Sequence, residues 1–511
     1  MSAPAGRDGS WWWRSGADDP QFAAPPAGRH AFDAVVIGGG VAGLMIATEL
    51  AASGRSVCVV EARRIAAGVT GSSTAKVSAL HGASYHRVAR HRGPDAAAVY
   101  AAANLAGIER YEQLIREHGI DCGWARIDAA TYASTSAKAE VVDRELDAAS
   151  AAGLPVIAAA DLATPFGVEA AVVCPDQAMF DPVRFSRGLA EVLRHDGVRI
   201  VEGRRVRHVE TGPPHVAHTD GGSFAAPVMV VATQLPVFDP GLFFARCSPV
   251  RSYSLAATVG APVPEVMTLS VDEPARSMRP TEPGSTTGVF GGGSHRVGEG
   301  GDTRRFQVDL ERWVREHFAV RSIDARWSAQ DYEAPDGVPF IGRMPHGPDG
   351  VYVATAFKKW GFTAAAVAGR IVAELVDGRD GPWSTTFDST RLASDLSGAG
   401  ELVQSNAKVA VHFVGDRLAT LRQEGVEALA PGEGAIVTVD GEKLAGHRDD
   451  EGQVHLVSAR CTHLGCLVAW NSAERSWDCP CHGSRFDVDG AVLTGPATLD
   501  LPRRDPGAGS D

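Results

Sequence analysis

Two short stretches near the C-terminus limit most strongly what this chain can fold into, because each combines cysteine and histidine at the spacing of metal ligands. The first reads Cys461-Thr-His463-Leu-Gly-Cys466, and the second reads Cys479-Pro-Cys481-His482-Gly-Ser484. One cysteine and one histidine from each stretch give four ligands, a set that also suits tetrahedral zinc. The additional cysteine in each stretch, the glycine and proline residues and the serine favour an iron–sulfur centre over zinc.

These residues resemble the Rieske [2Fe–2S] domain, in which two cysteines bind one iron and two histidines bind the other. The resemblance implies that Cys461 and Cys479 bind the first iron. It also implies that His463 and His482 bind the second iron. Such a cluster carries one electron at a time, so we expect the chain to transfer single electrons.

Three more residues of these stretches have counterparts in the Rieske family. Cys466 and Cys481 match the pair that respiratory-type Rieske domains join in a disulfide. The alternative is two free thiols that pack as small apolar residues. Ser484 matches the family serine that hydrogen-bonds a cluster sulfur, a contact that stabilises the reduced cluster.

A second motif, near the N-terminus, has the order that dinucleotide binding requires. A short apolar strand, 33–37, leads into Gly38-Gly-Gly40-Val-Ala-Gly43, and a helix-compatible stretch follows at 44–52. A second apolar strand, 55–60, then ends at Glu61. The glycines make a tight turn and admit the pyrophosphate to the backbone, and the acid is placed for the ribose hydroxyls. We therefore predict dinucleotide binding at this unit.

Glu61 favours an unphosphorylated ribose over NADP, and residues 66–76 are rich in glycine and small hydroxyl residues. This segment resembles the second FAD-contact stretch of the D-amino-acid oxidase superfamily, and the resemblance covers about residues 10–400. It implies FAD as the cofactor. Some amine oxidases of this superfamily attach FAD covalently through a cysteine or a histidine, but here Lys358, Lys359 and Trp360 occupy the corresponding loop, so we expect the FAD to be non-covalent. Four later segments carry the same resemblance: 228–233, 327–343, 351–355 and 357–363.

The resemblance implies a set of FAD contacts but no certain catalytic group. Lys359 and Trp360 could line the flavin face; the alternatives are a solvated lysine and a tryptophan packed between domains. Arg251, Tyr253 and Arg343 are candidate substrate contacts, with structural ion pairing as the alternative. The expected FAD contacts are Gly38, Gly40, Val41, Ala42, Gly43, Glu61, Ala62, Arg63, Gly68, Thr70, Ser73, Thr74, Val206, Ala232, Thr233, Gly342, Lys359, Gly361, Phe362 and Thr363.

The expected fold is an α/β (α+β) FAD-binding Rossmann-type domain with an antiparallel-sheet substrate domain, plus a small all-β Rieske domain. We predict helices at about 96–118 and 138–152 and a helix that starts at Asp181, and we interpret Gly291–Gly293 as a strand-ending turn. The predicted boundaries are an N-terminal arm 1–30, an FAD-dependent oxidoreductase 31–400, a connector 401–424 and a Rieske domain 425–505. Within the oxidoreductase the FAD-binding parts are about 31–90, 165–240 and 325–380, and the substrate parts are about 91–164 and 241–324.

Composition excludes several function classes. The 511 residues carry a net charge of −13 with scattered basic residues, which argues against nucleic-acid binding. No apolar stretch approaches the roughly 20 residues of a membrane span, so we predict no integral membrane segment. Trp11–Trp13 are too few for the core of a signal peptide, which favours a cytoplasmic protein.

Together these features predict an FAD-dependent oxidoreductase that oxidises an amine or amino-acid-like small molecule by hydride transfer to flavin N5. Electrons would then pass singly through the Rieske cluster to an external acceptor, a protein or a quinone that the sequence does not identify. One alternative is a reductase-type enzyme that receives electrons through the Rieske domain. The other is a non-catalytic redox sensor.

Overall fold

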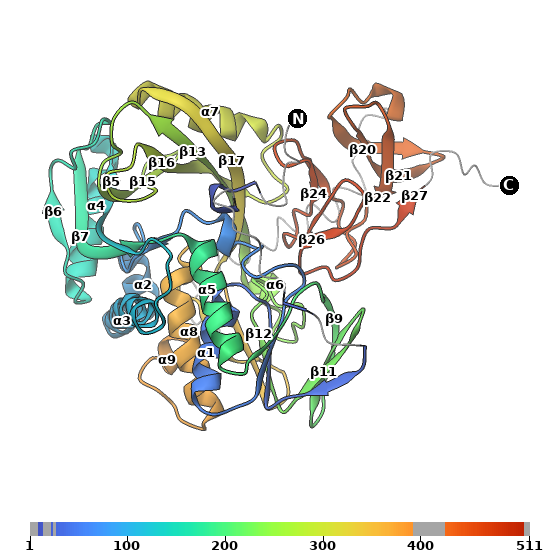
Figure 1. The fold of residues 1–511 in the computed structure, drawn as a ribbon. Helices are drawn as coiled ribbons and strands as arrows, with labels where there is room; N and C mark the ends of the chain where they lie inside the picture. The colour runs from blue at the N-terminus through green and yellow to red at the C-terminus, as the bar shows by residue number, and fades with distance from the viewer. Residues whose placement is uncertain (1–8, 14–21, 24–26, 392–424, 505–511) are drawn as a thin grey trace.

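The computed structural model describes residues 9–13, 22–23, 27–391 and 425–504, so the predicted connector 401–424 lies outside the described residues. Figure 1 shows a large body built from residues up to 391 and a smaller C-terminal domain that lies against one side of it. None of the described helices is both long and apolar enough to cross a membrane.

A six-stranded sheet forms the centre of the nucleotide-binding part. Its order is β18-β19-β12-β2-β3-β8, parallel except for β18. β2 and β3 are apolar and buried on both faces, as parallel strands covered by helices must be. The strands are β2 Ala34–Ile37, β3 Val57–Val60, β8 Arg199–Val201, β12 Val228–Val231, β18 Phe340–Arg343 and β19 Val351–Thr355. The helices α1 Val41–Ala52, α5 Pro182–His195 and α8 Gly361–Val376 lie side by side in Figure 1.

A nine-stranded, mostly antiparallel sheet forms the second part of the large body. Its strands are β4 Lys76–Val77, β5 Ala125–Ala133, β6 Ile157–Ala159, β7 Ala170–Met179, β13 Ser248–Val259, β14 Val266–Ser270, β15 Arg276–Pro280, β16 Thr287–Arg296 and β17 Val320–Glu333. The helices of this part are α2 Tyr85–Arg92, α3 Pro94–His118, α4 Ser136–Ala151 and α7 Arg304–His317. A separate four-stranded sheet contains β1 Arg29–Ala31, β9 Val206–Glu210, β10 His215–Thr219 and β11 Gly222–Ala226.

The C-terminal domain is built from two four-stranded sheets. In Figure 1 the sheet with β24 and β26 is the nearer of the two to the large body. The outer sheet contains β20 Gly434–Val439, β21 Glu442–Arg448, β22 Val454–Ser458 and β27 Arg503–Arg504. The inner sheet contains β23 Ala469–Asn471, β24 Ser476–Asp478, β25 Arg485–Phe486 and β26 Val492–Thr494. Short elements complete the described chain: η1 Trp11–Trp13, η2 Thr70–Ser72, α6 Phe243–Arg246, α9 Ser384–Phe387 and η3 Val426–Ala428.

This architecture confirms the predicted fold class, an α/β nucleotide-binding part, an antiparallel sheet and a small all-β domain. The helices expected near 96–118 and 138–152 are α3 and α4. Asp181 caps α5, since its Oδ1 accepts hydrogen bonds from the backbone N–H groups of Val183 and Arg184 at 2.9 and 3.0 Å.

The structure differs from the sequence prediction in two respects. Residues 170–179, assigned by sequence to the FAD-binding parts, lie in β7 of the nine-stranded sheet. Gly291–Gly293 lie inside β16, so their interpretation as a strand-ending turn was wrong. Gly293 has a positive φ of 65°, and a Cβ there would lie 2.8 Å from Cβ of Phe306, so both the backbone conformation and the packing favour glycine within this strand.

Candidate functional site

A cavity of about 280 Å³ opens where the parallel strands β2, β3, β12 and β19 end. The carboxyl end of a parallel sheet is the usual nucleotide site in such folds. The antiparallel β17 forms another wall, and residues of the C-terminal domain complete the lining. Sequence-predicted contacts that line the cavity are Gly38, Gly40, Val41, Ala42, Glu61, Ala62, Arg63, Gly68, Thr70, Ser73, Val206, Ala232, Thr233, Lys359, Gly361 and Phe362. The predicted contacts outside the lining are Gly43, Thr74, Gly342 and Thr363.

The glycines of the first turn leave no room for side chains. A Cβ on Gly43 would lie 1.9 Å from the carbonyl oxygen of Gly38, so Gly43 allows α1 to pack against the turn. A Cβ on Gly38 would lie 2.5 Å from the carbonyl oxygen of Ala232. With side chains excluded, the positive N-terminus of α1 faces the cavity, an arrangement that binds phosphate.

Two side chains fix this turn from outside it. The hydroxyl oxygen of Thr70 accepts a hydrogen bond from the backbone N–H of Val41, the first residue of α1, at 3.0 Å. The carboxylate of Glu61 accepts from the N–H groups of Gly39 at 2.7 Å and Arg63 at 2.8 Å. Glu61 therefore lies at the end of β3 beside the glycine turn, where a nucleotide ribose is expected. The cradle fits a dinucleotide such as FAD.

The loop before α8 is the strained wall of the cavity. Ala356, Lys358 and Lys359 all have positive φ angles, between 50° and 68°, a conformation that costs energy in residues other than glycine and often marks functional sites. Lys359 is open to the cavity but deeply set among protein atoms, and this burial lowers the pKa of its ammonium group. Its Nζ donates to Ser294 Oγ at 2.9 Å, and its backbone N–H donates to a carboxylate oxygen of Asp331.

The four expected cluster ligands meet in the C-terminal domain. The thiols of Cys461 and Cys479 are buried and hydrogen-bonded to each other, and the rings of His463 and His482 have centroids 5.1 Å apart. Nδ1 of His463 is buried without a hydrogen-bond partner among the described residues. A buried nitrogen lone pair two residues after the Cys461 thiol fits a metal ligand, because an unpaired polar atom is otherwise costly to bury.

A disulfide joins Cys466 and Cys481, as the resemblance implied, and ties the two cluster loops together. The sulfur atoms of Cys466, Cys479 and Cys481 also lie within 4.8 Å of one another. Two of these three sulfurs are consumed by the disulfide, so they cannot bind iron. The pair Cys461 and Cys479 remains as the thiolate ligands.

The cluster loops contact the cavity wall directly. Gln330 lines the cavity, and its Nε2 donates a hydrogen bond to the carbonyl oxygen of Gly483 at 2.8 Å. The hydroxyl of Tyr332 donates to the carbonyl oxygen of His482 at 3.0 Å. On the other side, the ring of Phe244 in α6 lies edge-on to both histidines, with centroids 5.2 Å from His463 and 4.8 Å from His482. The histidine side of the cluster site therefore faces the large body.

Buried charges of both signs bridge the two domains. Arg251 in β13 donates to Glu474 of the C-terminal domain at 3.3 Å. Glu474 also lies 3.9 Å from Arg485, which donates to Asp478 at 2.8 Å. Burial raises the pKa of Asp478, but Arg485 and Arg251 more than offset this and hold the pKa below its usual range. Since all four side chains are buried, removal of one would leave a charge without its partner.

Comparison with known proteins agrees with the site. The family model described as FAD dependent oxidoreductase matches residues 33–375, two thirds of the chain. The chain belongs to this family. A second model, the Rieske [2Fe-2S] domain, matches residues 409–503. The cradle and the Cys–His centre are thus those of an FAD-binding domain and a Rieske domain in one flavin oxidoreductase.

Three relatives show the extent of the likeness. YhfW of Bacillus subtilis (strain 168), named as a Rieske 2Fe-2S iron-sulfur protein, is 35% identical over 97% of each chain. The cytochrome b6-f complex iron-sulfur subunit of Synechococcus elongatus is 43% identical over 18% of this chain and 44% of the subunit. The structure of glycine oxidase from Geobacillus kaustophilus covers 71% of this chain and 99% of its own, with 20% identity and a TM-score of 0.59.

Of the five candidate residues of this flavin oxidoreductase, Lys359 and Arg251 line the cavity, and Trp360, Tyr253 and Arg343 do not. Trp360 stacks on His81 with ring centroids 4.5 Å apart. The hydroxyl of Tyr253 lies 3.2 Å from Nε2 of His295, and burial raises its pKa to about 12. Arg343 is more than half exposed at the end of β18 and lies 4.0 Å from Asp380. These three side chains have packing or surface partners outside the cavity lining.

Sequence reasoning missed Gln234 and Gln330 in the cavity wall. It placed Asp331 in the segment 327–343 that resembles the FAD family but did not name it as a contact, and the residue type of Gln330 does not single it out within that segment. Gln234 follows the predicted contact Thr233 directly and has a positive φ of 69°. Its amide donates to the carbonyl oxygen of Gln330, which ties β17 to the end of β12. Neutral amides carry no signal in sequence until such a contact is visible.

Asp331 should influence the flavin potential. Burial raises the pKa of this carboxyl to about 6, so above that pH its negative charge opposes electrons arriving on a nearby flavin. We expect Asp331→Asn to raise the midpoint potential at pH 8 by on the order of 1 kcal/mol of electrostatic free energy. At about pH 5 the wild-type carboxyl is mostly protonated, so the two proteins should converge. Equal differences at both pH values in a spectroelectrochemical titration would contradict this role.

Ser484 should influence the cluster potential. Its hydroxyl hydrogen-bonds the thiol of Cys461 and accepts from the backbone N–H of Ala497 at 3.0 Å. We expect Ser484→Ala to lower the midpoint potential of the cluster, because the reduced cluster loses a stabilising donor. A hydrogen bond of about 1 kcal/mol corresponds to roughly 40 mV for one electron. An EPR-monitored redox titration measures the shift, and an unchanged potential would show that the hydroxyl serves only Ala497.

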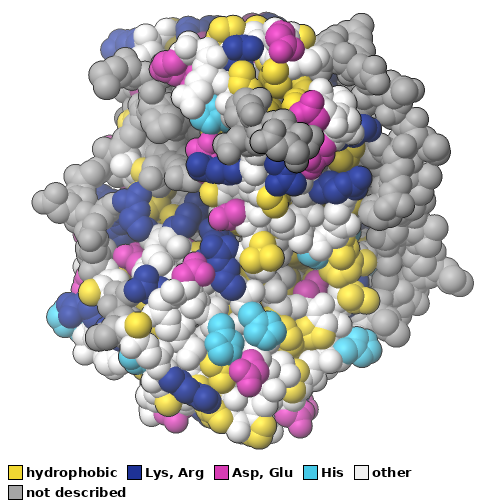
Figure 2. Space-filling model, turned by 90° about the vertical axis from the view of Figure 1, so that its right-hand side faces the viewer, with side chains coloured by type: hydrophobic (Ala, Val, Ile, Leu, Met, Phe, Trp, Pro, Cys, Tyr) yellow, Lys and Arg dark blue, Asp and Glu magenta, His cyan; other side chains and the backbone are white. Residues whose placement is uncertain are grey.

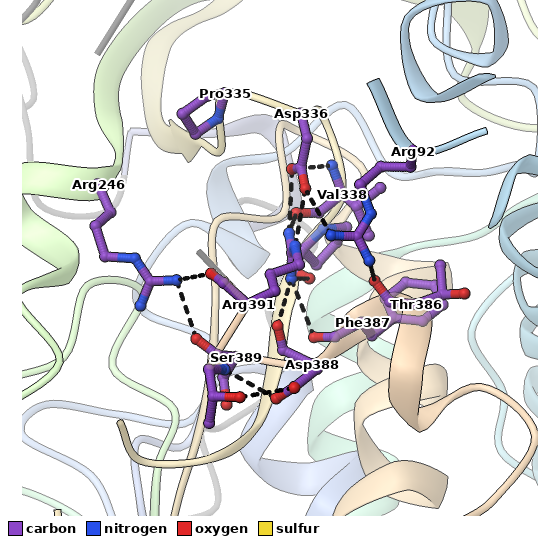
Figure 3. A network of polar contacts seen from close by, with 12 residues as sticks. Arg92, Arg246, Pro335, Asp336, Val338, Thr386, Phe387, Asp388, Ser389 and Arg391 are labelled. Carbon is purple, nitrogen blue, oxygen red and sulfur yellow. Dashed lines mark hydrogen bonds and ion pairs between the residues drawn. The ribbon is translucent and has the colours of Figure 1, made fainter. Parts of the chain in front are cut away.

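The polar network drawn in Figure 3 anchors α6 through Arg246. The same helix carries Phe244, whose ring packs edge-on against both cluster histidines. Nη2 of Arg246 donates to the carbonyl oxygens of Ser389 and Arg391 at 3.0 and 2.7 Å. The guanidinium of Arg391 in turn bonds the carboxylate of Asp336 at 2.8 and 3.1 Å. α6 is therefore fixed to the loop that leads to β18.

On the face shown in Figure 2, Lys and Arg side chains are interspersed with Asp and Glu side chains.

Proposed function

We propose that this flavin oxidoreductase oxidises an amine or amino-acid-like small molecule and passes the electrons singly, through the Rieske centre of the same chain, to an external acceptor protein or quinone. The observation that carries the proposal is the contact between the cavity and the cluster loop, in which Gln330 Nε2 donates to Gly483 at 2.8 Å. When bound, FAD takes a hydride from the substrate and the [2Fe–2S] cluster carries one electron at a time.

The side chains of the cavity suit an anionic or zwitterionic substrate. Lys359 places a cation at the wall formed by the loop before α8, whereas Arg251, which also lines the cavity, is paired with Glu474. The N-terminus of α8 adds partial positive charge on the same side, because its first residues, Gly361 and Phe362, line the cavity. A substrate carboxylate would be oriented by these charges. The name of the structural relative glycine oxidase agrees with this substrate class but concerns that protein.

The C-terminal domain also limits the access of water to the cavity. Glu474, Arg485, Thr494 and Gly495 of that domain are part of the lining. A shielded site protects an imine product from early hydrolysis and strengthens the charge interactions with the substrate. In the same arrangement the cluster loops contact β17 through Gln330 and Tyr332.

The test is an anaerobic titration of the purified holoprotein with a panel of amines and amino acids, followed by visible absorption and EPR. We expect one substrate class to bleach the flavin and then to produce a Rieske-type EPR signal. Flavin bleaching without a reduced cluster would refute the internal route. Reduction of both centres by a reduced ferredoxin, but by no member of the panel, would support the input direction instead.

A further inference from the structure

The segment Gly9–Trp13, which contains three consecutive tryptophans, reaches the cofactor cavity through its first two residues. Gly9 and Ser10 are part of its lining, and Trp12 is buried, with 3% of its surface exposed. These residues form η1 and the turn before it, which contact α5, β17 and η2. The segment precedes the nucleotide-binding unit in the chain by about twenty residues, so its position at the cavity does not follow from the glycine motif.

The contacts of this segment converge on η2, Thr70–Ser72, and on Ser73 after it. The hydroxyl of Ser10 donates to the carbonyl oxygen of Gly71. The indole N–H of Trp12 donates to the carbonyl oxygen of Ser73 at 2.8 Å. A Cβ on Gly71 would lie 2.8 Å from Nε1 of Trp13, so this glycine leaves room for the third indole.

The next link leads from this loop to the phosphate cradle. Thr70 holds the first N–H of α1, at Val41, as described above. The indole of Trp327 in β17 also donates to the carbonyl oxygen of Ser72 at 2.8 Å. Residues 70–73 are thus held by both the N-terminal segment and β17, and their first residue holds the turn that faces the cavity.

Cations hold the indoles in place. The guanidinium carbons of Arg64 and Arg187 lie 4.8 and 4.9 Å from the ring centroid of Trp13. That of Arg279 lies 4.8 Å from the ring of Trp12. Contacts of this kind are attractive because the aromatic face is electronegative. Arg64 belongs to the stretch that follows Glu61, so Trp13 also ties the ribose side of the cradle to α5.

We propose that Ser10, Trp12 and Trp13 form a strap that completes the FAD site: they hold residues 70–73 against the N-terminus of α1, so that FAD leaves only when these contacts open. The strap concerns FAD binding alone, whichever substrate is oxidised. Its loss should weaken FAD binding without disturbing the Rieske centre, which lies in the other domain.

The test compares Trp12→Ala with Trp11→Ala in the full-length holoprotein. Trp11 is the matched control, because it is half-buried and, among the described residues, makes neither a hydrogen bond to residues 70–73 nor a cation–π contact. We expect Trp12→Ala to raise the dissociation constant of FAD at least about tenfold, the equivalent of one lost hydrogen bond or more, and Trp11→Ala to change it little. Recovery of FAD fluorescence after dilution measures release, and the Rieske EPR signal reports integrity.

Two milder variants decide the matter should Trp12→Ala not fold. Trp12→Phe keeps a ring but loses the N–H, and Ser10→Ala loses only the hydroxyl; both should release FAD several times faster than wild type. Release at the wild-type rate in both, or equal effects of Trp11→Ala and Trp12→Ala, would overturn the strap. FAD that stays attached to denatured wild-type protein would also overturn it, because a covalent bond makes a strap redundant.

Discussion

Replacing His482 by alanine is expected to separate the two halves of the reaction. The flavin should still be reduced by substrate under anaerobic conditions, because the hydrogen bond from Tyr332 reaches the backbone carbonyl of His482 and does not involve its ring. The cluster should be lost, since one iron lacks a ligand. Turnover with a one-electron acceptor should then fall by roughly two orders of magnitude, about 2.7 kcal/mol in barrier height.

Stopped-flow reduction of the flavin and steady-state turnover with a one-electron dye measure the two halves separately. His455→Ala is a suitable control, because His455 lies in β22 of the same domain and its ring bonds Asp489 at 2.9 Å and Asp449 at 3.2 Å. That variant should keep both activities. Full turnover by a cluster-free His482→Ala protein would show that electrons leave the flavin without passing the Rieske centre.

The second large effect is expected from a single methyl group at the domain interface. Gly298 follows β16, and a Cβ there would lie 2.6 to 2.7 Å from the backbone and ring of Pro480. Pro480 stands between the expected ligand Cys479 and the disulfide-bonded Cys481. We expect Gly298→Ala to push the cluster loop away from the large body and to slow electron transfer from flavin to cluster at least about tenfold, a change of about 1.4 kcal/mol. The sequence of the Rieske domain is untouched, so its EPR spectrum should persist.

Gly301→Ala supplies the matched control. Gly301 lies in the same loop with a similar positive φ, 63° against 73°, but its Cβ would meet nothing within 4 Å. Both alanines carry the same backbone strain, of about 1 kcal/mol, and only one meets the cluster loop. The rate of cluster reduction after rapid mixing with substrate distinguishes them. Equal rates in the two variants would mean that the contact at Pro480 does not set the transfer rate.

The glycine turn and the cluster ligands could be predicted because each depends on residues that lie close together in the sequence. The turn from Gly38 to Gly43 depends on spacing within one strand–turn–helix unit, and the four cluster ligands lie within 22 positions of the chain. Glycine and cysteine are also informative residue types. A Cβ at Gly43 would lie only 1.9 Å from the carbonyl oxygen of Gly38, and cysteines that bind no metal have no reason to occur at the spacing of cluster ligands.

The walls of the cavity could not be predicted, since they depend on contacts between distant segments. Gln330 gains its importance only from a carbonyl group 153 positions later, at Gly483. Arg343 has a residue type typical of substrate binding, but the alternation of β18 turns its side chain outward. Residues 170–179 have the apolar pattern of any buried strand, and only their pairing with β5 places them in the nine-stranded sheet. Tertiary pairing decides such cases.

The charge bridge between the domains has a consequence for protein engineering. The positive charges of Arg251 and Arg485 are neutralised by the carboxylates of Glu474 and Asp478, and all of these residues except Arg251 belong to the Rieske domain. If another iron–sulfur domain were fused to the oxidoreductase in place of this one, Arg251 would be buried without the carboxylate of Glu474. A working chimera therefore needs an acid at the position of Glu474, or an apolar residue in place of Arg251, before any choice of cluster potential matters. The Rieske domain can therefore be exchanged only together with the residues of the oxidoreductase that neutralise its buried charges.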